Sequence, residues 1–217
     1  MPTPKKHPKS KTIPEPVASR LPNYLRSFVG FEREGRSTVS SQDLAEATGI
    51  RADQVRKDLA SFGSFGQRGI GYDVKKLDGT MREILGLNRA WRMALVGVGH
   101  LGMSLLQYGG FAKAGFRIEA AFDQDPSKIG WELEGVKIWP VQSLRQVVRD
   151  KQLEIGIVAV PSSRAQAVAD ALVDAGVKAV LNFAPCLITA PNSVLVRGVD
   201  LSSELEHLTY FLGKSKK

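Results

Sequence analysis

The chain has 217 residues, 43% of them hydrophobic and 24% charged, and a net charge of +8. This composition excludes a chain that is disordered throughout, and the length fits one large domain or two small ones. There is no apolar run of about 18 residues and no apolar block at the start, so we expect neither a membrane span nor a secretory signal. The single cysteine, Cys186, excludes an internal disulfide and favours a reducing interior such as the cytoplasm.

The positive charge is concentrated in the first part of the chain. Residues 1–92 carry 17 Lys and Arg against 10 Asp and Glu, whereas residues 93–217 carry 13 against 12. Such a local excess is typical of a domain that binds a polyanion. Residues 1–17 combine prolines with lysines, and we expect them to form a mobile basic tail rather than a packed element.

The first helix is predicted to begin near Ser19. Pro22 suits its first turn, because the N–H that proline lacks has no partner there. Its apolar face repeats at helical spacing and consists of Leu21, Tyr24, Leu25, Phe28 and Val29. A second, short helix is expected from Ser40, a typical N-cap, to Gly49, which tolerates the positive φ of a helix end.

A third helix is predicted over residues 53–62, with Val55, Leu59 and Phe62 on its apolar face and Arg56, Lys57 and Asp58 on its outer side. Four glycines follow, and Ile70, Tyr72 and Val74 alternate as in a strand. Three helices and a hairpin predict a winged helix, which reads the major groove with a helix and the minor groove with its wing. The side chains expected to contact DNA are Gln54, Arg56, Lys57, Ser61, Gln67 and Arg68.

Strands and helices alternate from residue 87 onward. We expect strands ending at Val98 and over 116–122, 136–139, 155–160, 177–183 and 194–199, and helices over 101–114, 141–150, 163–175 and 201–212. This order predicts an α/β domain with a doubly wound parallel sheet covered on both faces. The chain then divides into a tail (1–17), a winged helix-turn-helix domain (18–86), a Rossmann domain (87–200) and a C-terminal dimerisation helix with its tail (201–217).

The segment 97–102 reads Gly-Val-Gly-His-Leu-Gly between an apolar strand and a helix. In this context G-x-G-x-x-G indicates a dinucleotide site, with the pyrophosphate at the helix N-terminus. Asp123 ends the next strand, where a carboxylate binds ribose hydroxyls and repels a 2′-phosphate, so NAD(H) is favoured over NADP(H). The expected cofactor contacts are Gly97, Val98, Gly99, His100, Leu101, Gly102, Asp123, Val160, Pro161, Asn182, Phe183 and Ala184.

Other reactive residues are scattered. His7, His100 and His207 form no ligand cluster or acid–base pair, so we expect no metal site and no catalytic residues. Cys186 follows Pro185 without a nearby histidine, and we interpret it as a small apolar residue rather than a nucleophile.

Together these features resemble the Rex family of redox-sensing transcriptional repressors. The resemblance rests on the segments 19–21, 54–59, 62–72, 85–89, 97–102, 122–126 and 182–185. It implies a cytoplasmic homodimer, not an enzyme, that represses genes by binding a pseudo-palindromic DNA operator and leaves it when NADH replaces NAD⁺. It also implies a cofactor-reporting switch made of Arg20, Tyr108 and Asp200, and a swapped C-terminal helix at residues 201–212.

A mechanism for such a sensor requires that NADH favour the form that cannot bind DNA. We expect the reduced ring to enter an apolar pocket near Val160, Pro161, Phe183 and Ala184, and the two recognition helices then to lose the spacing of paired half-sites. Two other classes stay open at this point. An NAD-dependent dehydrogenase would need a substrate domain, for which few residues remain, and a CoA-binding domain of similar fold is compatible with Asp123.

Overall fold

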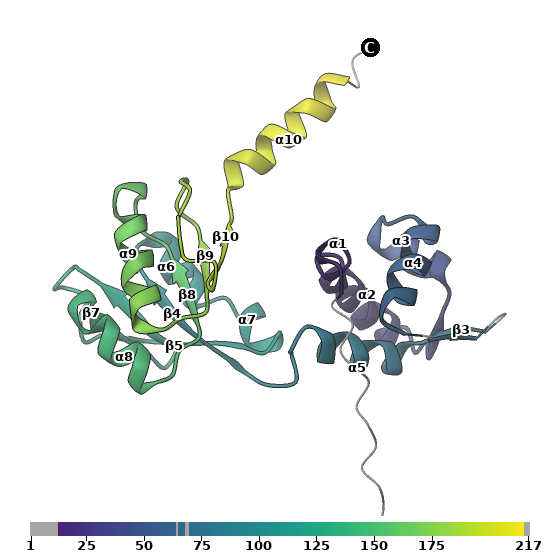
Figure 1. The fold of residues 1–217 in the computed structure, drawn as a ribbon, viewed down its shortest axis with the longest axis horizontal. Coiled ribbons are helices and arrows are strands. Elements are labelled where there is room, and N and C mark those ends of the chain that lie inside the picture. The colour runs from purple at the N-terminus through teal and green to yellow at the C-terminus, as the bar shows by residue number, and fades with distance from the viewer. Residues whose placement is uncertain (1–12, 64, 68–69, 215–217) are drawn as a thin grey trace, which may run out of the picture. The chain divides into compact units, whose positions relative to one another are not determined.

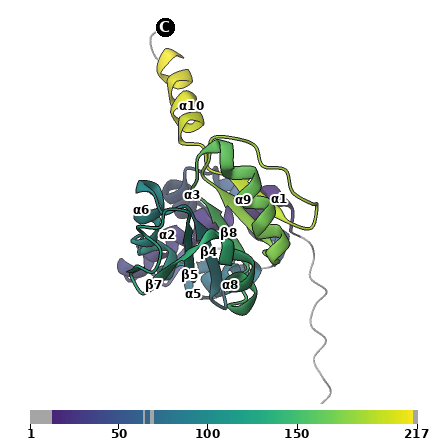
Figure 2. The ribbon, with the colours of Figure 1, turned by 90° about the vertical axis from the view of Figure 1, so that its left-hand side faces the viewer.

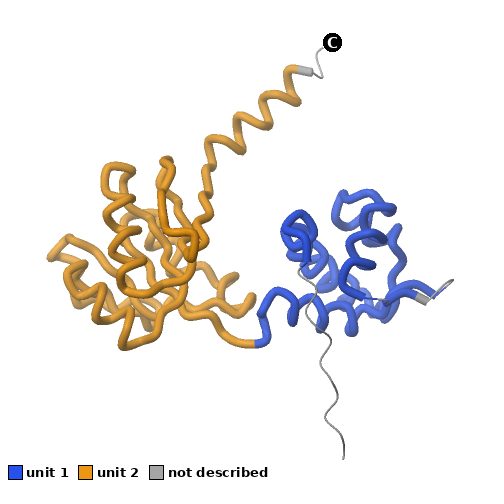
Figure 3. The backbone as a smooth tube through the Cα atoms, viewed as in Figure 1, with its two compact units in different colours: residues 1–88 blue, residues 89–217 orange. Residues whose placement is uncertain are grey.

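The computed structural model describes residues 13–63, 65–67 and 70–214, which fold into two compact units (Figure 3). Unit 1 ends at Asn88 and unit 2 begins at Arg89. The sequence places this boundary between residues 86 and 87. Each unit has its own buried apolar cluster or clusters, so each has the core of a separate domain.

Unit 1 combines helices with a small antiparallel sheet that contains β3 (Figure 1), and the strand order of this sheet is β1-β3-β2. Its elements are α1 (Glu15–Ala18), α2 (Leu21–Arg33), β1 (Thr38–Val39), α3 (Ser41–Thr48), α4 (Ala52–Phe62), β2 (Gly66–Gln67), β3 (Gly71–Asp73) and α5 (Val74–Ile84). Fully buried side chains from α2, α3, α4 and α5 form one cluster, which holds the helices together; they include Leu21, Tyr24, Leu44, Val55, Leu77 and Met81. The helices and the β2–β3 hairpin are those of a winged helix.

Packed structure begins earlier than the sequence predicts. The expected tail over residues 1–17 is wrong at its end, because α1 starts at Glu15 and Val17 is only 8% exposed. Pro14 is the N-cap of α1 and Pro16 lies in its first turn, where a missing N–H costs nothing. Residues 1–12 lie outside the described part of the chain.

The boundaries of α3 follow the predicted signals. The Ser40 hydroxyl accepts from the Asp43 N–H while the Asp43 carboxylate accepts from the Ser40 N–H, which is a complete capping box. Gly49 ends the helix at a φ of 71°. On α2, however, Val29 is 44% exposed and Phe31 is buried in its place, so the predicted apolar face is wrong at Val29.

The strand of the wing is shorter than the alternation of apolar residues predicts. β3 covers only Gly71–Asp73, Ile70 is 63% exposed, and Val74 is the first residue of α5. The Asp73 carboxylate accepts a hydrogen bond from the Lys76 N–H and so starts the helix there. The helix N-cap at Asp73 therefore places Val74 in a helix, although the alternation of apolar residues predicts a strand there.

Unit 2 is built on a seven-stranded sheet in the order β10-β9-β8-β4-β5-β7-β6 (Figure 1). Its strands are β4 (Trp91–Val96), β5 (Phe116–Asp123), β6 (Glu132–Leu133), β7 (Val136–Pro140), β8 (Ile155–Val158), β9 (Ala179–Asn182) and β10 (Leu195–Gly198). All neighbours pair in parallel except β6 and β7, so the sequence missed one antiparallel edge strand. The chain continues from β4 through β5 and β7 on one side and returns to β8 on the other, which makes the gap between β4 and β8 the topological switch point.

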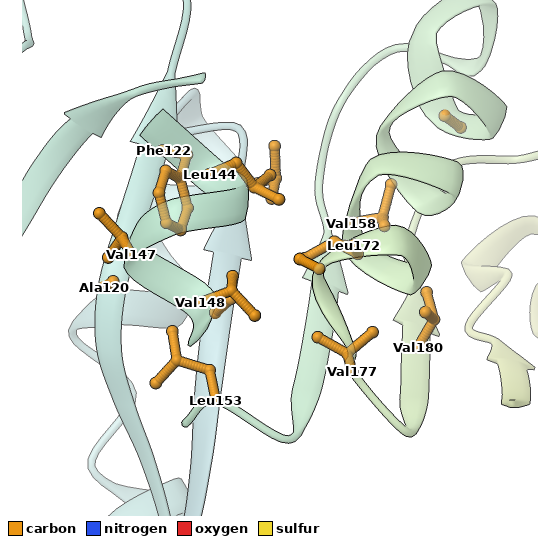
Figure 4. Close-up of a cluster of buried hydrophobic side chains, with 14 of the residues drawn as sticks. Ala120, Phe122, Leu144, Val147, Val148, Leu153, Val158, Leu172, Val177 and Val180 are labelled. Carbon is orange, nitrogen blue, oxygen red and sulfur yellow. The ribbon is translucent and has the colours of Figure 1, made fainter. Parts of the chain in front are cut away.

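Helices cover both faces of this sheet. They are α6 (His100–Leu106), α7 (Gly110–Lys113), α8 (Leu144–Asp150), which follows the 3-10 turn η1 (Val141–Ser143), and α9 (Ser162–Ala175). On one face α8 and α9 lie side by side (Figure 2), and Leu144 and Leu172 pack against Phe122 and Val158 (Figure 4). Leu106 of α6 and Phe111 of α7 belong to the cluster on the other face.

Two further expectations for unit 2 need correction. The helix predicted over 101–114 is two helices, α6 and α7, with a break that contains Gly109 and precedes Gly110, since consecutive glycines weaken a helix. The last helix, α10 (Leu201–Lys214), is present, and every side chain described in it is exposed.

Candidate functional site

The glycine loop lies at the switch point, between β4 and α6. Gly97 has a φ of 97°, and a Cβ there would lie 2.4 Å from the Ala159 carbonyl oxygen that follows β8. A Cβ on Gly102 would lie 1.9 Å from the Gly97 carbonyl oxygen, so α6 packs too closely on the loop for any side chain. A Cβ on Gly99 would meet nothing within 4 Å, which leaves open space beside the loop where a ligand could approach the backbone.

The Asp123 carboxylate holds this loop in place. Its Oδ2 accepts a hydrogen bond from the Val98 N–H at 2.7 Å, and its Oδ1 accepts one from the Asp125 N–H at 2.9 Å. The Lys128 Nζ lies 3.5 Å from Oδ2. Asp123 therefore acts first as an anchor of the glycine loop, a role that the sequence did not suggest, and each oxygen keeps acceptor capacity for a further donor.

A pocket of about 430 Å³ opens beside the loop. Its walls come from the ends of β4, β5 and β8 and from α9, and they include Gly97, Gly99, Asp123, Val160 and Pro161, all expected from the sequence. Gln124, Lys128 and Arg164 also line the pocket, and the sequence did not predict them. The guanidinium of Arg164 donates to the Gln124 side-chain oxygen at 3.2 Å, so α9 and the end of β5 meet at the pocket wall.

The end of β9 and the segment after it, which hold the predicted contacts Asn182, Phe183 and Ala184, do not line this pocket. Asn182 is 1% exposed, and its side-chain amide donates to the Ala184 and Cys186 carbonyl oxygens and accepts from the Ala184 N–H. Ala184 is buried in the core and Phe183 packs against the opposite cluster. The Asn182 side chain thus holds the turn that follows β9 in place. Cys186 packs against the same core as a small apolar residue.

His100, Leu101 and Gly102 belong to the first turn of α6 rather than to the pocket wall. Gly102 is buried, whereas His100 and Leu101 are exposed. The glycine loop lines the pocket through Gly97 and Gly99, and α6 begins directly after it.

Two of the expected DNA-contacting side chains are exposed on α4. Arg56 and Lys57 are exposed, and the Arg56 Nη1 donates to the Ser41 hydroxyl at 3.0 Å. The Ser61 hydroxyl instead donates to the Asp58 carbonyl oxygen at 2.6 Å. Gln67 is in β2 and pairs with Gly71, while its side chain and Arg68 lie outside the described residues.

The largest correction in unit 1 concerns Asp58, predicted on the outer side of its helix. It is 0% exposed and accepts from the Arg20 Nε at 2.6 Å, the Arg20 Nη2 at 2.8 Å, the Tyr24 hydroxyl at 2.8 Å and the Gln54 Nε2 at 2.7 Å. Val55, Asp58, Leu59 and Phe62 share one helical spacing, which would have predicted burial. Because the Gln54 side-chain amide donates to Asp58 one turn further along the same helix, it does not extend freely outward.

The carboxylate of Asp58 stays ionised in this setting. Burial raises its pKa, but the hydrogen bonds from Arg20, Gln54 and Tyr24 outweigh burial and leave the pKa below its usual value. Burial and the Asp58 carboxylate together raise the pKa of Tyr24, so its hydroxyl remains a donor.

The other two expected switch residues belong to unit 2. Tyr108 is 59% exposed, and its ring contacts that of Phe111 edge-on with centroids 5.0 Å apart. The Asp200 Oδ1 accepts from the Ser202 N–H at 2.9 Å and the Ser203 N–H at 3.3 Å, which makes Asp200 the N-cap of α10. An exposed aromatic ring and a cap carboxylate are both accessible to other groups.

Within the described residues there is no group of three or more His, Cys, Asp or Glu placed to hold a metal ion. No helix in that same part of the chain has the length and apolar character to cross a membrane.

Comparisons with known proteins agree with this architecture. A family model for the N-terminus of putative DNA-binding proteins matches residues 12–60, and a model for CoA binding domains matches residues 88–186. The chain is 34% identical to the Rex-family repressor RSP in its crystal structure with β-NAD⁺ and operator DNA, with a TM-score of 0.88 over 95% of both chains. Against RSP in complex with β-NADH the identity is 32% and the TM-score 0.86, over 95% of this chain and 97% of that one.

Curated relatives span nearly the whole chain. A redox-sensing transcriptional repressor Rex from Carboxydothermus hydrogenoformans is 50% identical over 91% of this chain and 95% of its own. A second, from Desulfitobacterium hafniense, is 47% identical over 94% and 98%. With a winged helix, a glycine loop at a switch point and this degree of identity, the chain belongs to the Rex family of redox-sensing transcriptional repressors.

Proposed function

We propose that this protein is a cytoplasmic repressor that binds operator DNA through unit 1 and releases it when NADH occupies the glycine-loop site of unit 2. The observation that carries the proposal is that one chain holds both parts: a winged helix whose helix α4 exposes Arg56 and Lys57, and a glycine loop with open space at Gly99. The related repressor RSP has been crystallised with β-NAD⁺ and operator DNA and also with β-NADH.

The nucleotide site fits a dinucleotide. The open space at Gly99 would accept the pyrophosphate against backbone N–H groups, and Asp123 would accept hydrogen bonds from a ribose. NAD⁺ and NADH act here as sensed ligands, so the protein is not an enzyme. Asp123 favours NAD(H) over NADP(H), because a 2′-phosphate beside it would be repelled.

The DNA-binding role is supported by side chains on α4. Arg56 and Lys57 are exposed and cationic, which suits contacts to phosphates or guanine edges. Gln54, Ser61, Gln67 and Arg68 remain proposed contacts, with Gln54 and Ser61 requiring release from their present partners. A dimer would present two copies of α4 to two half-sites.

The signalling step requires that NADH and NAD⁺ favour different arrangements of the dimer. A ligand shifts an equilibrium only by its differential affinity for two states, and a hundredfold preference corresponds to about 2.7 kcal/mol. We assign the reporting contacts to Arg20, Tyr108 and Asp200. Each has a polar or charged group that a new partner can reach, since 27% of the Arg20 side chain is exposed and Asp200 caps an exposed helix.

The test is an operator-binding titration at fixed salt with a varied NADH to NAD⁺ ratio, because basic DNA binders lose affinity steeply as salt rises. We expect the operator Kd to rise as the NADH fraction rises. A flat response, with the nucleotide shown to be bound, would eliminate the sensor.

A second candidate ligand is CoA, because the family model matching residues 88–186 is named for CoA binding. Competition against bound NADH separates the two ligands. We expect NAD⁺ to displace bound NADH and CoA not to displace it. Displacement of NADH by CoA at similar concentrations would favour CoA as the ligand.

A further inference from the structure

The Asp58 carboxylate is the one charged side chain that is fully buried among the described residues of unit 1. All its hydrogen bonds come from side chains, and they arise from three places in the chain. Arg20 precedes α2, Tyr24 lies in α2, and Gln54 lies one turn before Asp58 in α4. The carboxylate thus ties the start of α2 to α4, the helix proposed to read DNA.

Two features of this network go beyond what packing requires. The Asp58 Oδ1 accepts from both the Arg20 Nη2 and the Gln54 Nε2, so a proposed switch residue and a proposed DNA contact share one oxygen atom. Arg20 uses its Nε and Nη2 for Asp58, which is one edge of a planar group with two edges. The side chain remains 27% exposed, so part of it can be reached by a second acceptor.

We infer that Asp58 is a positioning residue that couples Arg20 to α4: it holds one edge of the guanidinium, so that a change at Arg20 is passed to the helix that carries Asp58. The inference rests on the proposed function and adds to it the step inside unit 1. A displacement of Arg20 then moves the Asp58 carboxylate and, with it, Gln54 and α4, because leaving a buried carboxylate unpaired is strongly unfavourable. Hydrogen-bonded side-chain networks of this kind respond as a unit.

The primary test is the Asp58→Asn variant. Asn has the same shape as Asp, but the substitution removes the negative charge. The amide NH₂ of Asn would also face donors that now bind a carboxylate oxygen. The measurement is the coupling ratio, the operator Kd with saturating NADH divided by that with saturating NAD⁺. We expect the ratio to fall by about fivefold or more, the scale of ordinary allosteric coupling factors.

The matched control is Asp78→Asn, which removes a different ion pair of the same unit. Asp78 Oδ2 binds the Arg82 Nε at 2.6 Å on α5, and its side chain is 21% exposed. We expect its coupling ratio to stay within about twofold of the parent, as for most partly exposed pairs. A purely stabilising role for Asp58 would lower the unfolding temperature without lowering the coupling ratio.

A folded Asp58→Asn protein with the parent's coupling ratio would overturn the inference. If that variant does not fold, Tyr24→Phe decides, because it removes one donor to the Asp58 carboxylate and leaves Arg20 in place. A reduced ratio in a folded Tyr24→Phe protein supports the inference, and an unchanged ratio refutes it. Failure of the proposed function would appear in the parent protein, as an operator Kd that does not depend on NADH. Failure of the inference alone would appear as a parent that responds to NADH and an Asp58→Asn variant that responds equally.

Discussion

At the scale of single residues, the glycines of the loop have separate tasks. A side chain at Gly102 would collide with backbone, whereas one at Gly99 would enter open space. Gly102 is therefore needed for the fold of the loop. We assign Gly99 to the close approach of the proposed nucleotide to the backbone. The G-x-G-x-x-G pattern alone does not separate these two tasks.

This difference predicts that two alanine variants both bind NADH less tightly but differ in thermal stability. Gly102→Ala should lower the unfolding temperature of unit 2 and weaken NADH binding, since the helix must move away from the loop. Gly99→Ala should keep the parent's unfolding temperature, because φ is −79° and no atom obstructs a Cβ. Its NADH affinity should nevertheless fall by about tenfold, equal to about 1.4 kcal/mol.

Calorimetry of both variants, with and without NADH, measures both quantities. Equal loss of thermal stability in the two variants would contradict the division of tasks. Unchanged NADH affinity in Gly99→Ala would show that no ligand group approaches the backbone at this position.

At the scale of elements, hydrogen bonds at helix ends set the boundaries in unit 1. The capping box of α3 adds an ion pair, because the Arg36 Nη2 lies 2.7 Å from the Asp43 Oδ1. Hydrogen bonds from Arg36 and Ser40 lower the pKa of Asp43 from 3.8 to about 2. The ionised carboxylate is therefore the form that stabilises the start of α3.

The sign of the resulting pH dependence follows from the lowered pKa. Asp43 stabilises the folded state fully above pH 3.8, and this contribution is lost as the pH falls to about 2. At neutral pH we expect Asp43→Asn to cost about 1 kcal/mol, the upper end of the usual contribution of an acidic side chain in the first turn of a helix. Hydrogen exchange of the α3 amides, compared between parent and variant from pH 7 to pH 2, checks this; a difference that persists unchanged at pH 2 would contradict it.

At the scale of the whole molecule, α10 carries apolar surface that a lone chain leaves in water. Leu201, Leu205, Leu208 and Leu212 are spaced by four, three and four residues and are each 58–68% exposed. This spacing makes one apolar stripe of the type that packs against a partner helix or groove. The stripe supports the proposed homodimer formed through this helix.

We expect Leu205→Glu combined with Leu208→Glu to shift the protein to monomers in sedimentation velocity at micromolar concentration. Operator affinity should fall with it, because a monomer contacts a single half-site. Glu206→Gln, on the same exposed helix but off the stripe, is the control and should sediment like the parent. A double variant that remains dimeric would place the dimer interface elsewhere.

Local patterns in the chain were sufficient to predict most of the elements in their order, the capping of α3, the glycine loop and the division into a DNA-binding and a nucleotide-binding part, but not α1, β6 or the break between α6 and α7. These features depend on neighbours within a few residues, such as Ser40 with Asp43 or Gly97 with the strand before it. Only the tertiary structure showed that Asp58 is buried against Arg20, 38 positions away, and that Asp123 binds the Val98 N–H, 25 positions away. Partners that are so distant in sequence meet only when whole helices and strands pack together. A buried carboxylate needs hydrogen-bond donors, and the packing decides which residues provide them.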